Sequence, residues 1–182
     1  MSDARSLLAR LRVPLGFLIA LLFLVFSSPS WLTLAIGSPI ALAGAFIRAW
    51  ASGHLQKNQS LATGGPYAFT RNPLYFGSFV MTLGCAVAGG STVLAFVLTI
   101  FFLVVYLPVM KSEADHMSQL FAREYRAWAR ETPLFFPRMA PYSARQDFRF
   151  DKSLYLKHRE YRAFLGLAAL FGVLILKVVR PF

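Results

Sequence analysis

A short polar stretch between two apolar runs carries side chains that can bind a charged ligand. It reads GGPYAFTRNPLYFGS over residues 64–78. Gly65 and Pro66 form a turn whose backbone can approach a ligand closely. Arg71 can hold a carboxylate through two parallel hydrogen bonds. The stretch therefore predicts a site for an anionic or zwitterionic group.

The same stretch predicts the start of a helix. Asn72 precedes a proline, which restricts it to extended geometry, and it can cap a helix that begins at Pro73. Free N–H groups and the positive end of the helix dipole favour a negative group at that point. Tyr67 and Tyr75 add hydroxyls and flat faces. The alternative is an ordinary interfacial anchor built from arginine and tyrosine at a helix end.

Three more polar side chains are candidates for the same site. Glu113 follows an apolar run and opens a segment with one apolar face, which makes it the best acidic candidate. His54 and Gln59 lie in the polar connection that precedes the stretch. The alternative for Glu113 is an acid that the dipole favours at a helix start. The alternative for His54 and Gln59 is a solvated loop.

Neither a metal nor a nucleic acid is an expected partner. Cys85 is the single cysteine and the three histidines are far apart in the sequence, which excludes an intrachain disulfide and predicts no metal site. The formal net charge is +11. No basic patch with interleaved aromatic residues stands apart from the apolar runs. The charge therefore predicts loops beside anionic lipid rather than a nucleic-acid partner.

The elements that must position these residues are apolar helices. Hydrophobic residues make up 57% of the chain and charged residues 15%, and the apolar runs approach the about 20 residues that cross a bilayer. We predict an all-α, polytopic membrane protein with about five transmembrane helices and a cytoplasmic amphipathic helix, in which Tyr125 and Trp128 pack inward. The predicted spans are 13–26, 32–52, 73–88, 92–110 and 163–179, and the amphipathic helix covers 113–130.

Lysine and arginine predict which side of the membrane each connection faces. The basic residues before the first helix, within 48–71 and throughout 111–162 fall on one side, which is cytoplasmic by the positive-inside rule. The active site then faces the cytoplasm. Lys177 and Arg180 fall on the opposite side if the last helix spans. The N-terminal run continues past Phe26 without a small-residue cleavage site, so we expect a retained helix rather than a cleaved signal peptide.

Two linked motifs resemble those of the isoprenylcysteine carboxyl methyltransferase and phospholipid methyltransferase group of membrane enzymes. The first is GPYAFTRNPLYFGS, which is similar to the group's Gly-Pro-Tyr, its Arg-His-Pro or Arg-Asn-Pro, and a following tyrosine and glycine. The second is SEADHMSQLFAREYRAWARETPLFFP, which is similar to an acidic dyad, a Phe-Gly, a tyrosine and a closing proline. Glu113, Phe121, Tyr125 and Pro137 match this second motif.

Three positions depart from the pattern of that group. Asn72 stands where histidine is usual, which is closer to the phospholipid-methylating and related bacterial branches. Ala114 replaces the second acid of the dyad, although Asp115 follows it. Ala122 replaces the glycine after the phenylalanine. The departures leave the implied cofactor unchanged and weaken any transfer of acceptor identity.

The resemblance implies one membrane methyltransferase-like domain over residues 1–182. Its signature core covers about 50–138, and a C-terminal cytoplasmic segment and last helix cover 139–182. The implied methyl donor is S-adenosylmethionine. The implied acceptor is a lipid or prenylated small molecule in the bilayer, either an isoprenylcysteine-type carboxyl or thiol compound or a phospholipid amine.

The resemblance also implies roles for the candidate residues. Arg71, or backbone N–H groups near the Gly65 turn, would hold the carboxylate of the cofactor, and Glu113 would accept from its ammonium or ribose. Arg71 and Glu113 are the predicted catalytic residues. An amine acceptor would need a general base, and the sequence does not single one out. The full predicted cofactor-binding set is His54, Gln59, Gly65, Pro66, Tyr67, Arg71, Asn72, Pro73, Tyr75 and Glu113.

Two other functions remain open. Membrane reductases of sterols, which use a nicotinamide cofactor, are related in their C-terminal portion but are generally longer than this chain. A non-enzymatic membrane scaffold or partner subunit would use the basic loops to bind anionic lipid. Binding of S-adenosylhomocysteine or of a nicotinamide dinucleotide discriminates the three functions. The sequence leaves the oligomeric state undetermined.

Overall fold

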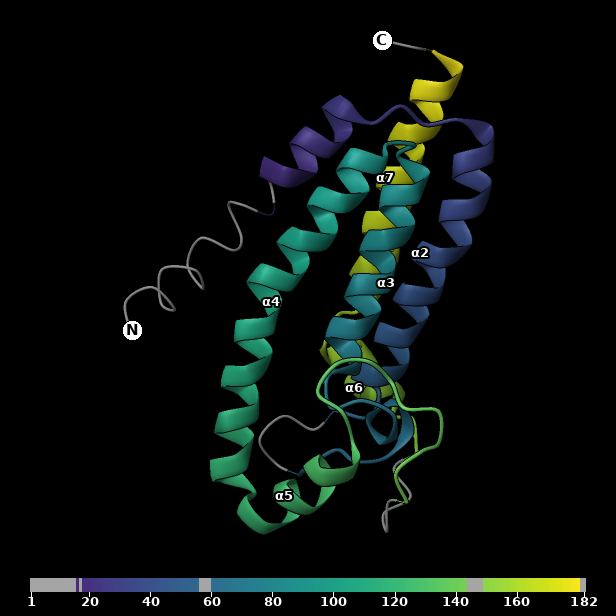
Figure 1. Ribbon diagram of the computed structural model, residues 1–182. Coiled ribbons are helices and arrows are strands. Elements are labelled where there is room, and N and C mark those ends of the chain that lie inside the picture. Colours follow the sequence, from purple (N-terminus) through teal and green to yellow (C-terminus); the bar gives the residue numbers. More distant parts are fainter. Residues whose placement is uncertain (1–15, 17, 56–59, 144–148, 181–182) are drawn as a thin grey trace.

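The computed structural model describes residues 16, 18–55, 60–143 and 149–180. All regular structure in these ranges is helical, as predicted. Figure 1 shows long helices that lie side by side, with the short helices at 122–131 and 152–157 at one end and the helical segment at 18–26 at the other. The elements after a first helical segment at 18–26 are α2 (Trp31–Ser52), the 3-10 helix η1 (Gly65–Ala68), α3 (Pro73–Ala88), α4 (Thr92–Leu120), α5 (Ala122–Glu131), α6 (Lys152–Lys157) and α7 (Tyr161–Val179).

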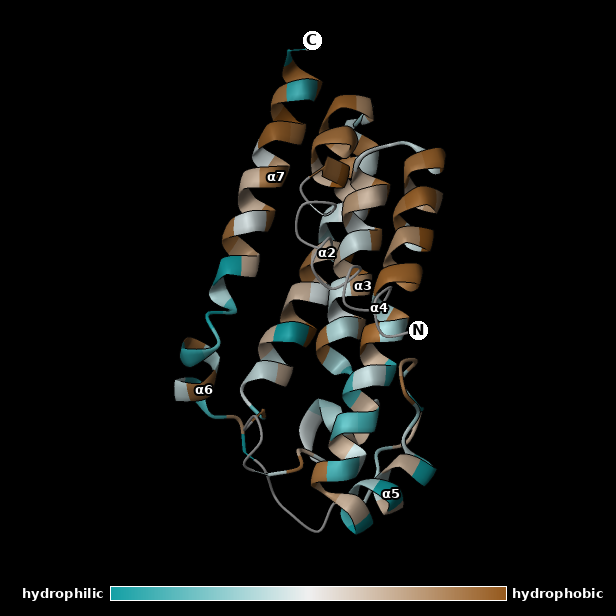
Figure 2. Cartoon of the chain, turned by 90° about the vertical axis from the view of Figure 1, so that its left-hand side faces the viewer, coloured by the Kyte–Doolittle hydropathy of each residue, from teal (hydrophilic) through white to brown (hydrophobic). Residues whose placement is uncertain are grey.

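The chain is a polytopic membrane protein. Helices α2, α4 and α7 are long and apolar enough to cross a bilayer, and α3 is a shorter apolar helix of 16 residues. Figure 2 shows hydrophobic residues along the long helices and hydrophilic residues at the end that holds α5 and α6. Of the predicted first span, residues 13–15 and 17 lie outside the described residues. The remaining predicted spans coincide with α2, α3, α4 and α7.

Polar residues in the short connections set where two of the long helices begin. Ser30 caps α2: its hydroxyl accepts from the backbone N–H of Thr33 at 3.2 Å, and the Thr33 hydroxyl accepts from the Ser30 N–H at 2.8 Å. Ser91 caps α4 by accepting from the backbone N–H of Leu94 at 3.4 Å. These caps satisfy N–H groups that have no partner within the helix.

Helices α2 and α3 pack backbone to backbone through glycine. A Cβ placed on Gly44 would lie 2.6 Å from the carbonyl oxygen of Gly77, well inside van der Waals contact. Ala41 and Ala45 of α2 are fully buried beside this contact. Small residues are what allow membrane helices to approach so closely. The pair forms a rigid base from which the first turn of α3 projects.

Helix α4 is longer than the sequence predicted. It continues without a break from Thr92 to Leu120, so the prediction of a separate amphipathic helix from residue 113 is wrong in its start. No glycine or proline interrupts residues 109–120, and the helix ends only where Ala122 adopts a positive φ of 26°. At about 1.5 Å per residue the helix exceeds the about 30 Å of a bilayer core, so its last turns stand clear of the apolar layer.

Lys177 has a structural role at the other end of the bundle. Its ammonium donates to the carbonyl oxygens of Leu24 and Ser27, at 2.8 and 2.7 Å. Leu24 lies in the last turn of the helix at 18–26 and Ser27 directly follows it, and a cation is favoured by the dipole at this end of a helix. This contact gives a local reason for a basic residue on the side opposite the other charged connections.

Candidate functional site

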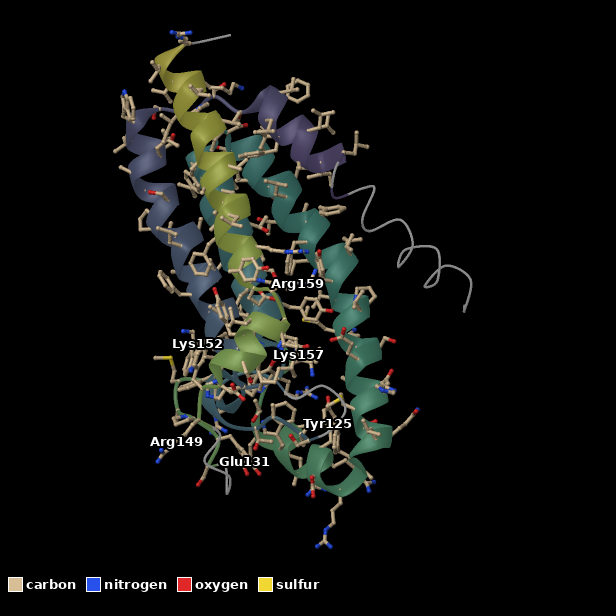
Figure 3. The ribbon with its side chains drawn as sticks, turned by 180° about the vertical axis from the view of Figure 1, so that it is seen from behind. Tyr125, Glu131, Arg149, Lys152, Lys157 and Arg159 are labelled. Carbon is tan, nitrogen blue, oxygen red and sulfur yellow. The ribbon has the colours of Figure 1, made fainter. Side chains whose placement is uncertain are left out.

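A cavity of about 530 Å³ lies where α3 begins and α4 leaves the apolar layer. Helix α5 covers it, and the buried side chains of Tyr125 and Trp128 form part of its wall. The Trp128 indole N–H donates to the carbonyl oxygen of Tyr67 at 3.2 Å, which fixes α5 over η1. Figure 3 shows Tyr125 among the side chains at this end of the molecule. The predicted site residues that line the cavity are Tyr67, Arg71, Asn72, Pro73, Tyr75 and Glu113.

Arg71 lines this cavity, and one of its side-chain N–H groups has no acceptor among the described residues. Its Nη1 donates to the Tyr125 hydroxyl at 2.9 Å, and its backbone N–H donates to the carbonyl of Pro133 at 2.9 Å. Its Nε is buried, and none of the described groups accepts a hydrogen bond from it. A buried guanidinium N–H without an acceptor is costly. The arrangement therefore suits a ligand that brings an oxygen acceptor to Arg71.

Asn72 makes a different contact from the one predicted. It occupies the position before α3, but its side chain makes no cap hydrogen bond. Its amide instead donates to the carbonyl of Leu134 at 2.9 Å, and the neighbouring Thr70 hydroxyl donates to the carbonyl of Phe135 at 2.8 Å. The chain that follows α5 is thereby tied to the start of α3. These hydrogen bonds hold the segment after α5, the helix that covers the cavity, close to the start of α3, which lines it.

Glu113 faces α3 from α4. Its carboxylate oxygen accepts from the Tyr75 hydroxyl at 2.8 Å. Because α4 is continuous here, Glu113 is not an acid at the start of a helix. That alternative is therefore wrong. The carboxylate lines the cavity together with Arg71, so one cation and one anion face the same space.

The hydroxyl of Tyr67 stays protonated. Its side chain is only 6% exposed. Burial raises the pKa of this phenol well above its usual range, and the nearby carboxylates of Glu113 and Glu160 raise it further. Tyr67 is therefore a hydrogen-bond donor at the cavity and not a base.

Three of the predicted residues that the structure describes, His54, Gly65 and Pro66, do not line the cavity. His54 is buried beside η1, with its Nδ1 2.9 Å from the carbonyl oxygen of Trp50. It lies against Gly65, whose φ of 57° and lack of a Cβ allow this approach. Pro66 is buried in η1. Gln59 lies outside the described residues. His54 thus supports the Gly65 turn from behind.

Two functional-site residues escaped the sequence analysis. Arg48 of α2 donates through Nε and Nη2 to both carboxylate oxygens of Glu160, at 3.0 and 2.8 Å. Its Nη1 donates to the carbonyl of Leu74 and to the Ser78 hydroxyl. Arg48 and Glu160 both line the cavity. The available signal was an acid placed directly before the last apolar run, opposite an arginine inside an apolar helix.

Comparison with known proteins gives a family and two relatives. The sequence profile "Phospholipid methyltransferase" matches residues 17–124. The "Cobalt-zinc-cadmium resistance protein CzcN" of Cupriavidus metallidurans is 32% identical over 145 residues, covering 78% of this chain and 65% of that protein. The "Nickel-cobalt-cadmium resistance protein NccN" of Alcaligenes xylosoxydans xylosoxydans is 34% identical over 125 residues, covering 68% and 54%. The chain thus spans less than two thirds of the length of these relatives. No solved structure matches it.

The names of both relatives concern resistance to metals. Within the ranges that the structure describes, no group of three or more histidine, cysteine, aspartate and glutamate side chains is placed to hold a metal ion. The names describe those two proteins and give no acceptor for this chain. The chemistry of the site has to be argued from the cavity itself.

Proposed function

The chain belongs to the phospholipid methyltransferase family, and from that premise we propose that it transfers a methyl group from S-adenosylmethionine to an acceptor held in the membrane. The cavity beside Arg71 and Glu113 supports this proposal. Its volume of about 530 Å³ falls in the range of roughly 300–1,000 Å³ that is usual for small-molecule sites. Apolar and polar side chains both line it, and its charged groups are of both signs, with Arg48 and Arg71 facing Glu113 and Glu160.

The buried Nε of Arg71 is the observation that carries the proposal. It lacks an acceptor among the described groups, and the carboxylate of the donor molecule would supply one. Glu113 would hold the ammonium group at the same end of the donor. The apolar wall formed by Leu61, Ala62 and Trp128 would contact the adenine. When bound, S-adenosylmethionine supplies a methyl group on a positively charged sulfur.

The residues of this chain would act by positioning and by excluding water. Tyr125 and Trp128 of α5 are buried where they line the cavity, so α5 would help to keep solvent from the reacting groups. Because its raised pKa keeps the Tyr67 phenol protonated, this phenol could donate a hydrogen bond to a ligand but would not act as a base. An acceptor that is already ionised needs no base. An amine acceptor would give its proton to a carboxylate, and Glu113 and Glu160 are those that line the cavity.

The site is proposed to face the cytoplasm. The basic residues Arg149, Lys152 and Lys157 lie toward the end of the molecule that holds α5 and α6 (Figure 3). The positive-inside rule assigns such an end to the cytoplasm. The soluble donor would then enter from the cytoplasm, and the acceptor from the bilayer.

The test is a binding measurement on the purified full chain in detergent. Calorimetry should show micromolar binding of S-adenosylhomocysteine and none of a nicotinamide dinucleotide. Binding of the dinucleotide alone would indicate a reductase, and binding of neither would favour a non-enzymatic scaffold. Incubation with methyl-labelled donor and a host lipid extract should then label a lipid fraction. Absence of both binding and labelling would overturn the proposal.

A further inference from the structure

A second cavity of about 490 Å³ lies between α3, α4 and α7. Its wall along α4 runs from Leu98 to Tyr106, which is roughly 12 Å of helix. Leu98, Phe101 and Phe102 make most of this wall apolar, and Met81 of α3 adds to the apolar lining. A cavity inside a membrane protein that combines an apolar helix wall with charged residues suits an amphiphile better than a wholly polar molecule.

The two cavities share one wall. Arg48 and Glu160 line both of them. Their ion pair therefore stands between the space proposed for the methyl donor and the apolar space beside α4. A molecule in the second cavity would therefore lie near the same ion pair that lines the donor cavity.

The polar end of the second cavity is strongly basic. Arg159 and Arg162 line it, and Glu160 is the one acidic residue of its lining. Glu160 is already occupied by Arg48. The described residues offer Arg159 and Arg162 no ion-pair partner. Arg159 adopts a left-handed backbone with φ of 57°, which is uncommon outside glycine, and in Figure 3 it lies between α7 and α4.

We propose that this second cavity holds the methyl acceptor, and that Arg159 and Arg162 select an amphiphile with an anionic group, a carboxylate or a phosphate. The inference rests on the proposed function and specifies its acceptor. The charged residues that line the two cavities support assigning the donor to the first and the acceptor to the second. Arg48 and Glu160 line both cavities; in the donor cavity Arg71 and Glu113 add one charge of each sign, whereas the second cavity adds Arg159 and Arg162, with which no described residue forms an ion pair. Guanidinium groups bind both carboxylate and phosphate strongly.

The first experiment measures binding of three probes with the same alkyl chain. The full chain is placed in nanodiscs of phosphatidylcholine and titrated with radiolabelled palmitate, hexadecyl phosphate and hexadecanol. At least one anionic probe should bind about tenfold or more tightly than the alcohol. Tighter binding of palmitate indicates a carboxylate acceptor, and tighter binding of hexadecyl phosphate indicates a phosphate. Equal affinity for all three probes overturns the proposal.

Paired variants locate the binding. Arg159→Ala with Arg162→Ala should lose the preference for the anionic probes, whereas Arg126→Ala with Arg130→Ala on α5 should keep it. An equal loss in both double variants would mean that overall charge attracts the probes, which overturns the proposal. Ala163→Trp, which fills the second cavity, should abolish probe binding.

A matched variant and a second ligand separate this inference from the function on which it rests. Ala168→Trp places the same bulk on an exposed position of α7 and should leave probe binding intact. S-adenosylhomocysteine should bind all of these variants as it binds the wild type, because the donor cavity is unchanged. If the protein does not bind S-adenosylhomocysteine but keeps its preference for the anionic probes, the proposed methyltransferase function is overturned and the anion-selective site is not. Intact donor binding with probes unaffected by Ala163→Trp would overturn the acceptor site alone.

Discussion

The guanidinium of Arg48 holds both carboxylate oxygens of Glu160, at 3.0 and 2.8 Å, across 112 positions of the sequence. The side chains are only 23% and 12% exposed. This bidentate pair joins α2 to the residue before α7 and lines both cavities. Removing one partner of such a pair leaves a charge without compensation in a poorly solvated place.

Breaking the pair should therefore affect stability and methyl transfer separately. Glu160→Gln is expected to lower the free energy of unfolding by about 1–3 kcal/mol, because Arg48 loses its counter-charge. The double variant Arg48→Leu with Glu160→Leu should recover much of that loss, because no unpaired charge remains. It should not recover transfer of labelled methyl groups to lipid. Thermal unfolding and labelling measure the two effects, and a double variant with wild-type transfer would show that the pair is only structural.

Arg71 should contribute to donor affinity through its charge. Arg71→Ala is expected to weaken the binding of S-adenosylhomocysteine by roughly 1.5–3 kcal/mol, the usual strength of a hydrogen bond to a charged group. Tyr125→Phe removes the 2.9 Å bond to Arg71 but keeps the cation, so its effect should be smaller. Calorimetry on both folded variants measures the difference. An Arg71→Ala protein that binds as tightly as the wild type would remove this residue from the site.

Glu113 should contribute to donor affinity, whereas the nearby Asp115 should not. Glu113→Gln keeps the shape of the side chain but removes the charge that would hold the donor ammonium, so donor affinity should fall about tenfold or more. Asp115→Asn removes a charge two residues away on an exposed part of α4 that does not line the cavity. It should leave calorimetric affinity unchanged. Equal losses in the two variants would mean that only the general field of the helix acts on the donor.

The start of α3 was predictable because its signals are local. A proline preceded by an asparagine restricts a few neighbouring dihedrals, and the observed helix begins at Pro73 as predicted. The break expected before Glu113 was wrong for a related reason. The change from apolar to polar residues there reflects the edge of the bilayer rather than the end of α4. Composition reports the environment, whereas a helix ends where its backbone geometry changes, here at Ala122.

The pairing of Arg48 with Glu160 was not predictable in the same way. Each residue fits an ordinary pattern alone, one as a cytoplasmic arginine and the other as an acid in a basic segment. Their meeting depends on how α7 returns against α2, which no local pattern encodes. His54 illustrates the converse, because a histidine near the signature stretch supports the turn at Gly65 from a position outside the cavity lining.

The contact of α2 with α3 should tolerate no added methyl group at Gly44. Gly44→Ala would press against the backbone of α3, and the resulting strain is expected to cost about 1–3 kcal/mol. Gly172→Ala is the matched control in α7, where nothing lies within 4 Å of the added carbon. That variant should be neutral or stabilised by about 0.5–1 kcal/mol, because alanine favours a helix over glycine. Thermal unfolding in detergent compares the two, and a neutral Gly44→Ala would contradict the close packing.

Lys177 should contribute to stability without touching either ligand site. Lys177→Met keeps an apolar stem but leaves the carbonyls of Leu24 and Ser27 without their donor. The midpoint of thermal unfolding should fall by an amount equivalent to roughly 1–2 kcal/mol. Arg180→Ala, which removes an exposed charge at the same end of α7, should have little effect. Because the donor cavity lies at the opposite end of the bundle, the affinity for S-adenosylhomocysteine should be unchanged in both variants. A Lys177→Met protein with normal stability but weakened donor binding would show that this end of the molecule is coupled to the site.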